Sequence, residues 1–169
     1  VYNRYYRKLI GDKLGLKIWD EQFSELVRKL FRLLYDQNID YTIFFRTLSD
    51  FPRKIPEVFF NQFTQLKDLE QWLKSYEKLI EREGSDLIKR RNEMNQTNPK
   101  FILRNYLLQK AINLALKHSD FSEIERLMIL LQKPFQDQPE LFSQHRIDAD
   151  YYSSPTPDSF IEMRLSCSA

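Results

Sequence analysis

The sequence predicts an all-α fold of five to seven helices. Only three of its 169 residues are glycine. Apolar residues recur at the three- and four-residue spacing of a helix face, and the alternation typical of a strand is nearly absent. Aromatic residues make up 14% of the chain, and because such side chains bury large areas, they favour a packed core over an extended linker.

The composition argues against several classes of protein. The 26 basic residues nearly balance the 24 acidic ones, so the chain lacks the strong positive field with which proteins bind nucleic acid. Its apolar runs are too short to cross a membrane, and its first ten residues lack the apolar centre of a signal peptide. A single cysteine cannot form a disulfide within the chain, which favours a reducing compartment. We therefore expect an intracellular protein with no nucleic-acid or membrane partner.

Two helical features are expected in the first 51 residues. Apolar residues at helical spacing over residues 18–35 indicate one helix most clearly. Residues 41–51 could form a buried helix or a strand, and Asp40 in front of them favours the helix because aspartate is a good N-cap. The segment GDKLG, residues 11–15, lacks the strand and the Lys-Ser/Thr pair of a phosphate-binding loop, so we interpret it as a helix-end turn.

Prolines separate this region from the next helix. Pro52 and Pro56 disfavour helix at and before their own positions, so residues 51–65 are expected to form a loop with at most one short helical turn. Another apolar stripe, over residues 66–80, indicates a helix that ends near Gly84. Glycine can adopt the left-handed conformation that closes helices.

A basic helix, capped by Ser85, is expected next. It contains the run Lys89, Arg90 and Arg91, which could bind a phosphate group. Acidic residues precede and follow the run, so we interpret it as a solvated helix face with paired charges.

Residues 98–133 are expected to form a helical hairpin. Asn98 would cap its first helix, with Pro99 at the first helical position, where proline is tolerated. Ser122 and Glu125 have the spacing of a capping box, which indicates the start of the second helix. The short connection between the two stripes favours antiparallel neighbours.

The last part of the chain shows no period. It contains four prolines and scattered Asp and Ser residues, so we expect an irregular tail that is ordered only where it lies against other residues. The expected organisation is a helical region over residues 1–133 and an irregular tail over residues 134–169.

The motifs of this chain indicate no catalytic, cofactor-binding or metal-binding residues. His118 and His145 are 27 residues apart and have no nearby Cys or His companion, whereas a structural zinc site needs four ligands at short spacings. Asp148 and Asp150 form a carboxylate pair, but nothing around them would raise a pKa for acid–base chemistry. We interpret the pair as surface acidity.

Cys167, third from the end, is the only cysteine. One interpretation is an incidental residue of the tail. The other is an exposed thiol that can be oxidised or exchanged, and a disulfide would then need a partner outside this chain.

Several segments together resemble a known family. They are KLGL (13–16), DYTIFFRTLSDF (40–51), QWLKSY (71–76), NPKFILRNYLLQKAI (98–112), DFSEIERLMILLQKPFQDQPE (120–140) and SCSA (166–169). In this order and spacing they resemble the C-terminal region of the selenoprotein O (SelO) family, over nearly the whole chain.

The resemblance implies a function for a longer protein of which this chain is a fragment. SelO proteins are kinase-like pseudokinases that transfer AMP from ATP to Ser, Thr or Tyr of target proteins, with ATP and Mg²⁺ held upstream of the matched region. The chain would then be the helical C-terminal part of a kinase-like fold. It would have no activity alone, and its partners would be the N-terminal catalytic half and the protein substrates. The alternative is a free-standing helical interaction module without catalysis.

The resemblance also bears on the thiol and on the compartment. The position of Cys167 is selenocysteine in some SelO members and cysteine in others, which implies a redox-regulatory thiol. The expected location is the cytoplasm for a bacterial protein and the mitochondrion for a eukaryotic one.

Overall fold

A computed structural model of the chain describes residues 2–53, 55–145, 148–157 and 160. The described residues are helical or irregular, without a strand, so the predicted all-α class is confirmed. Among the described residues, seven helices have eight residues or more, and three are shorter. Across these same residues, no helix is both long and apolar enough to span a bilayer.

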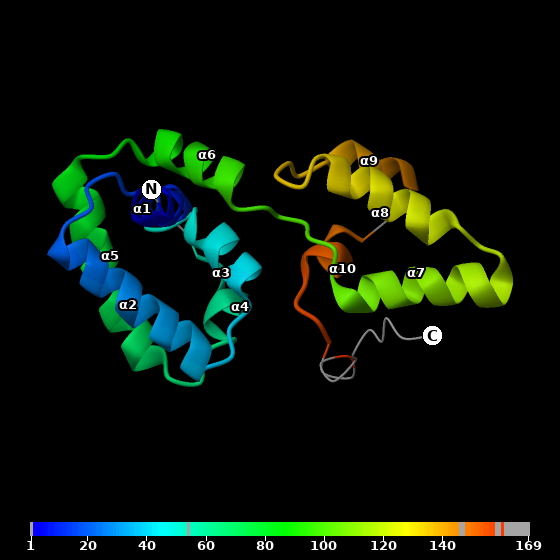
Figure 1. Cartoon of the computed structure of the whole chain (residues 1–169), viewed down its shortest axis with the longest axis horizontal. Helices are drawn as coiled ribbons and strands as arrows, with labels where there is room; N and C mark the ends of the chain where they lie inside the picture. Colours follow the sequence, from blue (N-terminus) through cyan, green and yellow to red (C-terminus); the bar gives the residue numbers. More distant parts are fainter. Residues whose placement is uncertain (1, 54, 146–147, 158–159, 161–169) are drawn as a thin grey trace. The chain divides into compact units, whose positions relative to one another are not determined.

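The chain divides into two compact units, residues 1–98 and residues 99–169. The first unit holds α1 (Tyr2–Leu14), α2 (Glu21–Asp36), α3 (Tyr41–Leu48), α4 (Glu57–Phe60), α5 (Leu66–Glu83) and α6 (Leu87–Thr97). Helices α2 and α5 pack against each other, and α1 packs on α3 and α6 (Figure 1). The expected loop after α3 contains the single short turn α4, as predicted.

Aromatic side chains fill the centre of the first unit. Phe44 of α3 lies with its ring centroid 5.5 Å from that of Phe59 and 5.9 Å from that of Trp72 on α5. Trp72 also donates a hydrogen bond from Nε1 to the carbonyl of Leu26 on α2, at 2.9 Å. Its buried polar atom is therefore paired, as an indole in a core requires.

Aspartate side chains begin three helices of the first unit. Asp20 accepts from the amide of Phe23, and Asp40 accepts from that of Ile43, which confirms Asp40 as the N-cap of α3. The N-cap of α6 is Asp86, which accepts from the amides of Ile88 and Lys89. The expectation that Ser85 caps this helix was wrong. A carboxylate one position later satisfies two helix-end amides and complements the helix dipole.

The second unit holds α7 (Asn105–His118), α8 (Ser122–Gln132), α9 (Pro139–His145) and α10 (Ala149–Ser153). Helices α7 and α8 run antiparallel and pack together, so the predicted hairpin is confirmed (Figure 1). Its buried residues join those of α10 in a core of their own: Phe101, Tyr106, Leu107, Ala111, Leu127, Leu130 and Tyr152.

The hairpin begins later than expected, because Asn98 ends α6 and does not start α7. Its side-chain amide donates to the carbonyl of Lys13 at 2.9 Å, and its side-chain oxygen accepts from Lys13 Nζ at 3.2 Å. Pro99 is consequently not the first residue of a helix. The next two amides, of Lys100 and Phe101, donate to the carbonyl of Pro134.

The start of α8 also differs in detail from the capping box expected for Ser122 and Glu125. The side chain of Asp120 accepts from the amide of Ser122 at 2.9 Å, while Glu125 is exposed. Ser119 has a φ of 51° and closes α7 in the left-handed conformation. The side chain of Asp120 therefore supplies the acceptor for the first amide of α8.

The segment after Pro134 is more regular than expected and packs within the second unit. Helix α10 begins at Asp148, whose carboxylate accepts from the amide of Asp150, and both are exposed, as expected for surface acidity. Tyr152 is buried in the core of this unit. The compact units thus divide at residues 98 and 99, whereas the sequence suggested a boundary at 133 and 134. Helices of five and seven residues are too short to show a period.

Replacing Leu107 by alanine should lower the free energy of unfolding by about 2 to 5 kcal/mol, the range for a buried leucine. Leu107 lies in the core of the second unit and is almost fully buried. Leu116, on the same helix but exposed, supplies the control, and its alanine variant should change stability by less than about 0.5 kcal/mol. Urea unfolding of both variants measures the difference, and equal effects would contradict the assigned core.

Candidate functional site

The basic run of α6 is divided between surface and core. Lys89 and Arg91 are exposed, and they pair with Glu93 and Asp50 respectively. Arg90, between them, is only 2% exposed. The interpretation of the run as a solvated helix face was therefore wrong for Arg90, because the helix turns this position inward.

Arg90 connects its own helix, α6, to three other parts of the first unit. Its Nη1 donates to the carbonyl of Phe51 at 2.9 Å, and its Nη2 donates to the carbonyl of Leu14 at 3.4 Å and to the hydroxyl of Tyr76. The guanidinium carbon also lies 5.1 Å from the centroid of the Tyr76 ring. The planar fork of arginine can reach all three acceptors at once, which an ammonium group cannot.

Tyr76 completes this arrangement from α5. Its hydroxyl donates to the carbonyl of Leu14 at 2.5 Å while accepting from Arg90. The ring stacks between those of Phe51 and Trp72, with centroids 5.7 Å and 5.0 Å away. We call Arg90, Tyr76, Phe51 and the Leu14 carbonyl the Arg90 cluster.

Gly15 allows the side chains of Arg90 and Met94 to approach the end of α1 closely. It follows α1 with a φ of +63°, a conformation that glycine adopts most readily. A Cβ atom here would lie 2.7 Å from Cγ of Arg90 and 2.8 Å from Sδ of Met94. The expected helix-end turn over residues 11–15 is therefore confirmed, and its last glycine also permits close packing against α6.

Burial raises the pKa of Tyr76 to about 12, although the Arg90 guanidinium opposes this rise. The folded state thus retains the phenol proton at pH values where an unfolded tyrosine, with a pKa near 10, has lost it. The contribution of Tyr76 to stability is fully present below pH 10 and declines as pH rises towards 12.

Between pH 10 and pH 12 the free energy of unfolding should therefore fall by up to about 3 kcal/mol on account of Tyr76. Other groups titrate in this range, so the comparison is with Tyr76→Phe, which lacks this ionisation. Denaturant unfolding across the range should give a steeper decline for the native chain than for the variant. Parallel declines would contradict the assignment.

The second unit contains a buried carboxylate with three partners. Glu123 of α8 accepts from the hydroxyl of Tyr152 at 3.1 Å and pairs with Arg126 at 3.1 Å and Lys110 at 3.5 Å. Burial, followed by the charge of Glu123, raises the pKa of Tyr152. This cluster joins α10 to the α7–α8 hairpin, so it holds the segment that leads towards the end of the chain.

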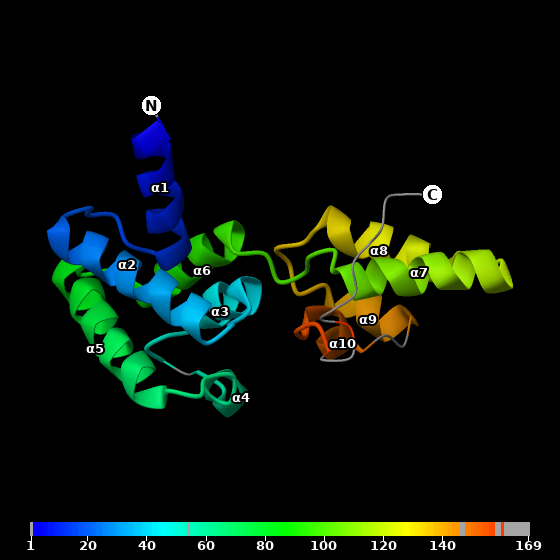
Figure 2. The ribbon, with the colours of Figure 1, turned by 60° about the horizontal axis from the view of Figure 1, so that its bottom comes forward.

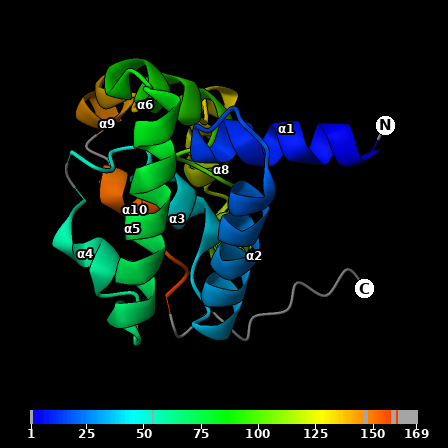
Figure 3. The same cartoon turned by 90° about the vertical axis from the view of Figure 1, so that its left-hand side faces the viewer.

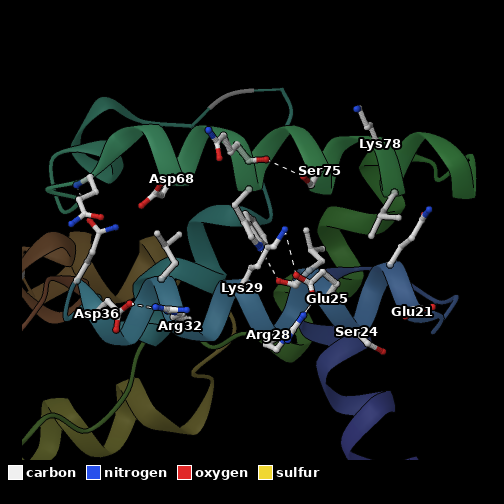
Figure 4. A pocket seen from close by; sticks show the side chains of 18 residues that line it. Glu21, Ser24, Glu25, Arg28, Lys29, Arg32, Asp36, Asp68, Ser75 and Lys78 are labelled. Atoms are coloured by element: carbon white, nitrogen blue, oxygen red, sulfur yellow. Dashed lines mark hydrogen bonds and ion pairs between the residues drawn. The ribbon is translucent and has the colours of Figure 1, made fainter.

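An open groove of about 1240 Å³ runs between α2 and α5 (Figure 4). Leu26 and Trp72 are among its apolar lining residues. Its charged residues pair with one another along α2: Glu25 with Lys29 at 3.4 Å, and Arg32 with Asp36 at 3.4 Å. This mixed and largely self-paired lining gives the groove no evident ligand class.

The candidate residues from the sequence do not come together. Cys167 lies outside the described residues. His118 is an exposed residue at the end of α7, and the placement of His145 leaves its side chain undescribed. In the parts of the chain that the structure describes, no group of three or more His, Cys, Asp or Glu side chains could hold a metal ion.

Sequence reasoning missed Arg90 and Glu123, although Arg90 had a visible signal. Arg90 is three residues after Leu87 and four before Met94, so a cation occupies one position of the apolar stripe of α6. The acceptors that make this position possible are distant in sequence. No comparable local pattern distinguishes Glu123 from its neighbour Glu125.

Comparison with known proteins identifies the family. The model of the family described as protein adenylyltransferase SelO matches residues 1–132 of the 169. The chain belongs to the SelO family. The match spans the Arg90 cluster and the α7–α8 hairpin that carries Glu123.

Curated relatives of this SelO chain are named protein nucleotidyltransferase YdiU. The relative from Cupriavidus metallidurans is 35% identical over 176 residues, covering 100% of the chain and 29% of the relative. The one from Pseudomonas fluorescens is 33% identical over 171 residues, covering 100% of the chain and 33% of the relative. The one from Vibrio atlanticus is 34% identical over 167 residues, covering 99% of the chain and 33% of the relative. This SelO chain therefore spans about a third of the length of the curated relatives that it matches.

Proposed function

We propose that this chain is the C-terminal helical part of a SelO protein that transfers AMP from ATP to hydroxyl groups of target proteins. The family match over residues 1–132 is the observation that carries the proposal. The curated relatives are named nucleotidyltransferases and are about three times as long as the matched region, which leaves room for a catalytic part outside this chain.

In the proposed reaction, a Ser, Thr or Tyr hydroxyl of the target attacks the α-phosphorus of ATP. The new oxygen–phosphorus bond replaces the bond to the β-phosphate, and pyrophosphate leaves. Mg²⁺ would stabilise the charge that develops on the phosphates. The SelO resemblance places the ATP and Mg²⁺ sites upstream of the matched region, so we assign both to the remainder of the protein.

The role proposed for this chain is to support that catalytic part. The Arg90 cluster suits this role because it joins α5 and α6 to the ends of α1 and α3 through buried hydrogen bonds. Both terminal nitrogens of Arg90 are hydrogen-bonded, whereas its buried Nε has no hydrogen-bond partner. Hydrogen bonds among buried groups favour one arrangement of the surrounding helices. A catalytic part packed on such a unit would rest on a defined surface.

Labelled ATP tests this function in the full-length protein. Label from the α-phosphate should remain on protein after the reaction, and label from the γ-phosphate should not. Retention of the γ-label would instead indicate a kinase. Retention of neither would favour the alternative, a helical interaction module without catalysis.

We further propose that Cys167 regulates the full-length protein by forming a disulfide with a cysteine outside this chain. Two thiols would lose two protons and two electrons to an oxidised disulfide such as that of glutathione, which is reduced to its thiol form. AMP transfer should then respond to the thiol–disulfide balance in the native protein and not in Cys167→Ser. An identical redox response in both proteins would refute this role.

A further inference from the structure

The first two turns of α1 have little contact with the rest of the first unit. Tyr5 is 69% exposed and Leu9 is 37% exposed, whereas Ile10 and Leu14, in the later turns, are buried. Figures 2 and 3 show the N-terminal end of α1 extending away from the other helices of this unit. Tyr5 and Leu9 are four residues apart, so they lie on one face of the helix.

This projecting segment is poorly stabilised by its own unit. Its main inward contacts are those of Tyr6 and Arg7 with the ring of Trp19, at 6.3 Å and 5.6 Å. Two helical turns are too short to be stable in water without packing.

The exposed face has a defined chemistry. Tyr5 and Leu9 supply an apolar stripe, and Arg4 and Lys8, also four residues apart, lie beside it. Lys8 pairs with Asp12 at 2.5 Å, so the face retains a positive charge overall. A complementary surface would be an apolar groove edged by carboxylates.

We propose that this face of α1 binds such a groove in the part of the full-length protein outside this chain. The occupant follows from the length of the relatives, two thirds of which lies beyond the matched region. A second copy of the chain would bring the same net positive charge to the contact. Two apolar side chains are also too few for stable binding to a membrane surface. The inference rests on the proposed function only in taking the catalytic part as the partner.

Photocrosslinking in the full-length protein tests the contact. A photoreactive phenylalanine analogue at position 5 should form crosslinks to residues of the same polypeptide outside this chain, mapped by mass spectrometry. The matched control is position 35, where Tyr35 is 84% exposed near the end of α2. Crosslinks from position 5 to a second copy or to added anionic lipid vesicles would overturn the proposal. Crosslinks from position 5 that are no more frequent than those from position 35 would also overturn it.

Charge reversal gives a second test. Arg4 and Lys8 are exposed, so in Arg4→Glu/Lys8→Glu a free α1 should exchange its amide hydrogens at an unchanged rate. An α1 bound to carboxylates should exchange faster, by about fivefold, because binding is lost. Lys74→Glu/Lys78→Glu makes the same change at exposed positions of α5 and should leave exchange in α1 unchanged. Unchanged or slower exchange in the α1 variant would overturn the proposal.

Neither measurement depends on catalysis. A full-length protein that transfers no AMP but gives the expected crosslinks and exchange would refute the proposed reaction alone. Active transfer without the crosslinks would refute this inference alone.

Discussion

Replacing Arg90 by alanine is expected to lower the free energy of unfolding by about 3 to 5 kcal/mol. The substitution leaves the carbonyl of Phe51 without its buried donor, weakens the pairing of the Leu14 carbonyl and removes the group that donates to Tyr76. Each buried polar group left unsatisfied costs about 1 to 3 kcal/mol, and the lost side chain also leaves a cavity.

Arg91→Ala is the matched control for this experiment. Arg91 is the next residue of α6, has the same charge, and pairs with Asp50 where both side chains are partly exposed. Exposed ion pairs contribute about 0 to 1 kcal/mol, so this variant should remain close to the native stability. Chemical denaturation followed by circular dichroism gives both values. Similar small losses of stability in the two variants would indicate that the whole basic run, Arg90 included, is a solvated helix face.

Arg90→Lys separates the shape of the side chain from its charge. Lysine keeps the positive charge but cannot reach three acceptors with a planar fork. We therefore expect it to recover less than half of the stability lost in Arg90→Ala. Full recovery would show that charge alone accounts for the position.

Replacing Gly15 by alanine is expected to cost about 2 to 5 kcal/mol, through two effects that add. The backbone has a φ of +63°, where a non-glycine residue costs about 1 to 2 kcal/mol. The new Cβ would also lie within 3 Å of Arg90 and Met94 side-chain atoms, and forcing extra atoms into a packed core costs typically about 1 to 3 kcal/mol.

Gly84 separates the two effects. It closes α5 with a φ of +60°, and a Cβ atom there would meet nothing within 4 Å. Gly84→Ala should therefore show the backbone cost alone, about 1 to 2 kcal/mol. Thermal unfolding of the two variants measures the packing contribution as their difference. Equal losses would show that the close approach at Gly15 is relieved by movement of the Arg90 and Met94 side chains.

The helices that sequence reasoning located correctly share one property. The stripes over residues 18–35 and 66–80 repeat at the helix period, so their local pattern specifies both the helix and the face that is buried. The left-handed end at Gly84 and the helix-end turn that finishes at Gly15 were also predicted, because glycine is the residue that adopts the left-handed conformation most readily. Asp40 was a correct N-cap for the same kind of local reason.

Helix ends were harder to predict where distant groups decide them. Asn98 has the side chain of a good N-cap, yet it bonds to Lys13, which is 85 residues away in sequence, and ends α6 instead. Ser85 and Asp86 are both good caps, and only the path of the chain determines which side chain reaches the free amides. Intrinsic capping preference does not distinguish between such neighbours.

The sequence by itself determined the all-α class, the main helices, the α7–α8 hairpin and the family, because each depends on local periodicity or on ordered motifs. Only the tertiary structure decided that Arg90 is buried while Lys89 and Arg91 are exposed. The acceptors of Arg90 come from Leu14, Phe51 and Tyr76, and Glu123 likewise finds Tyr152 from another helix. Burial of a charge depends on partners that folding brings together.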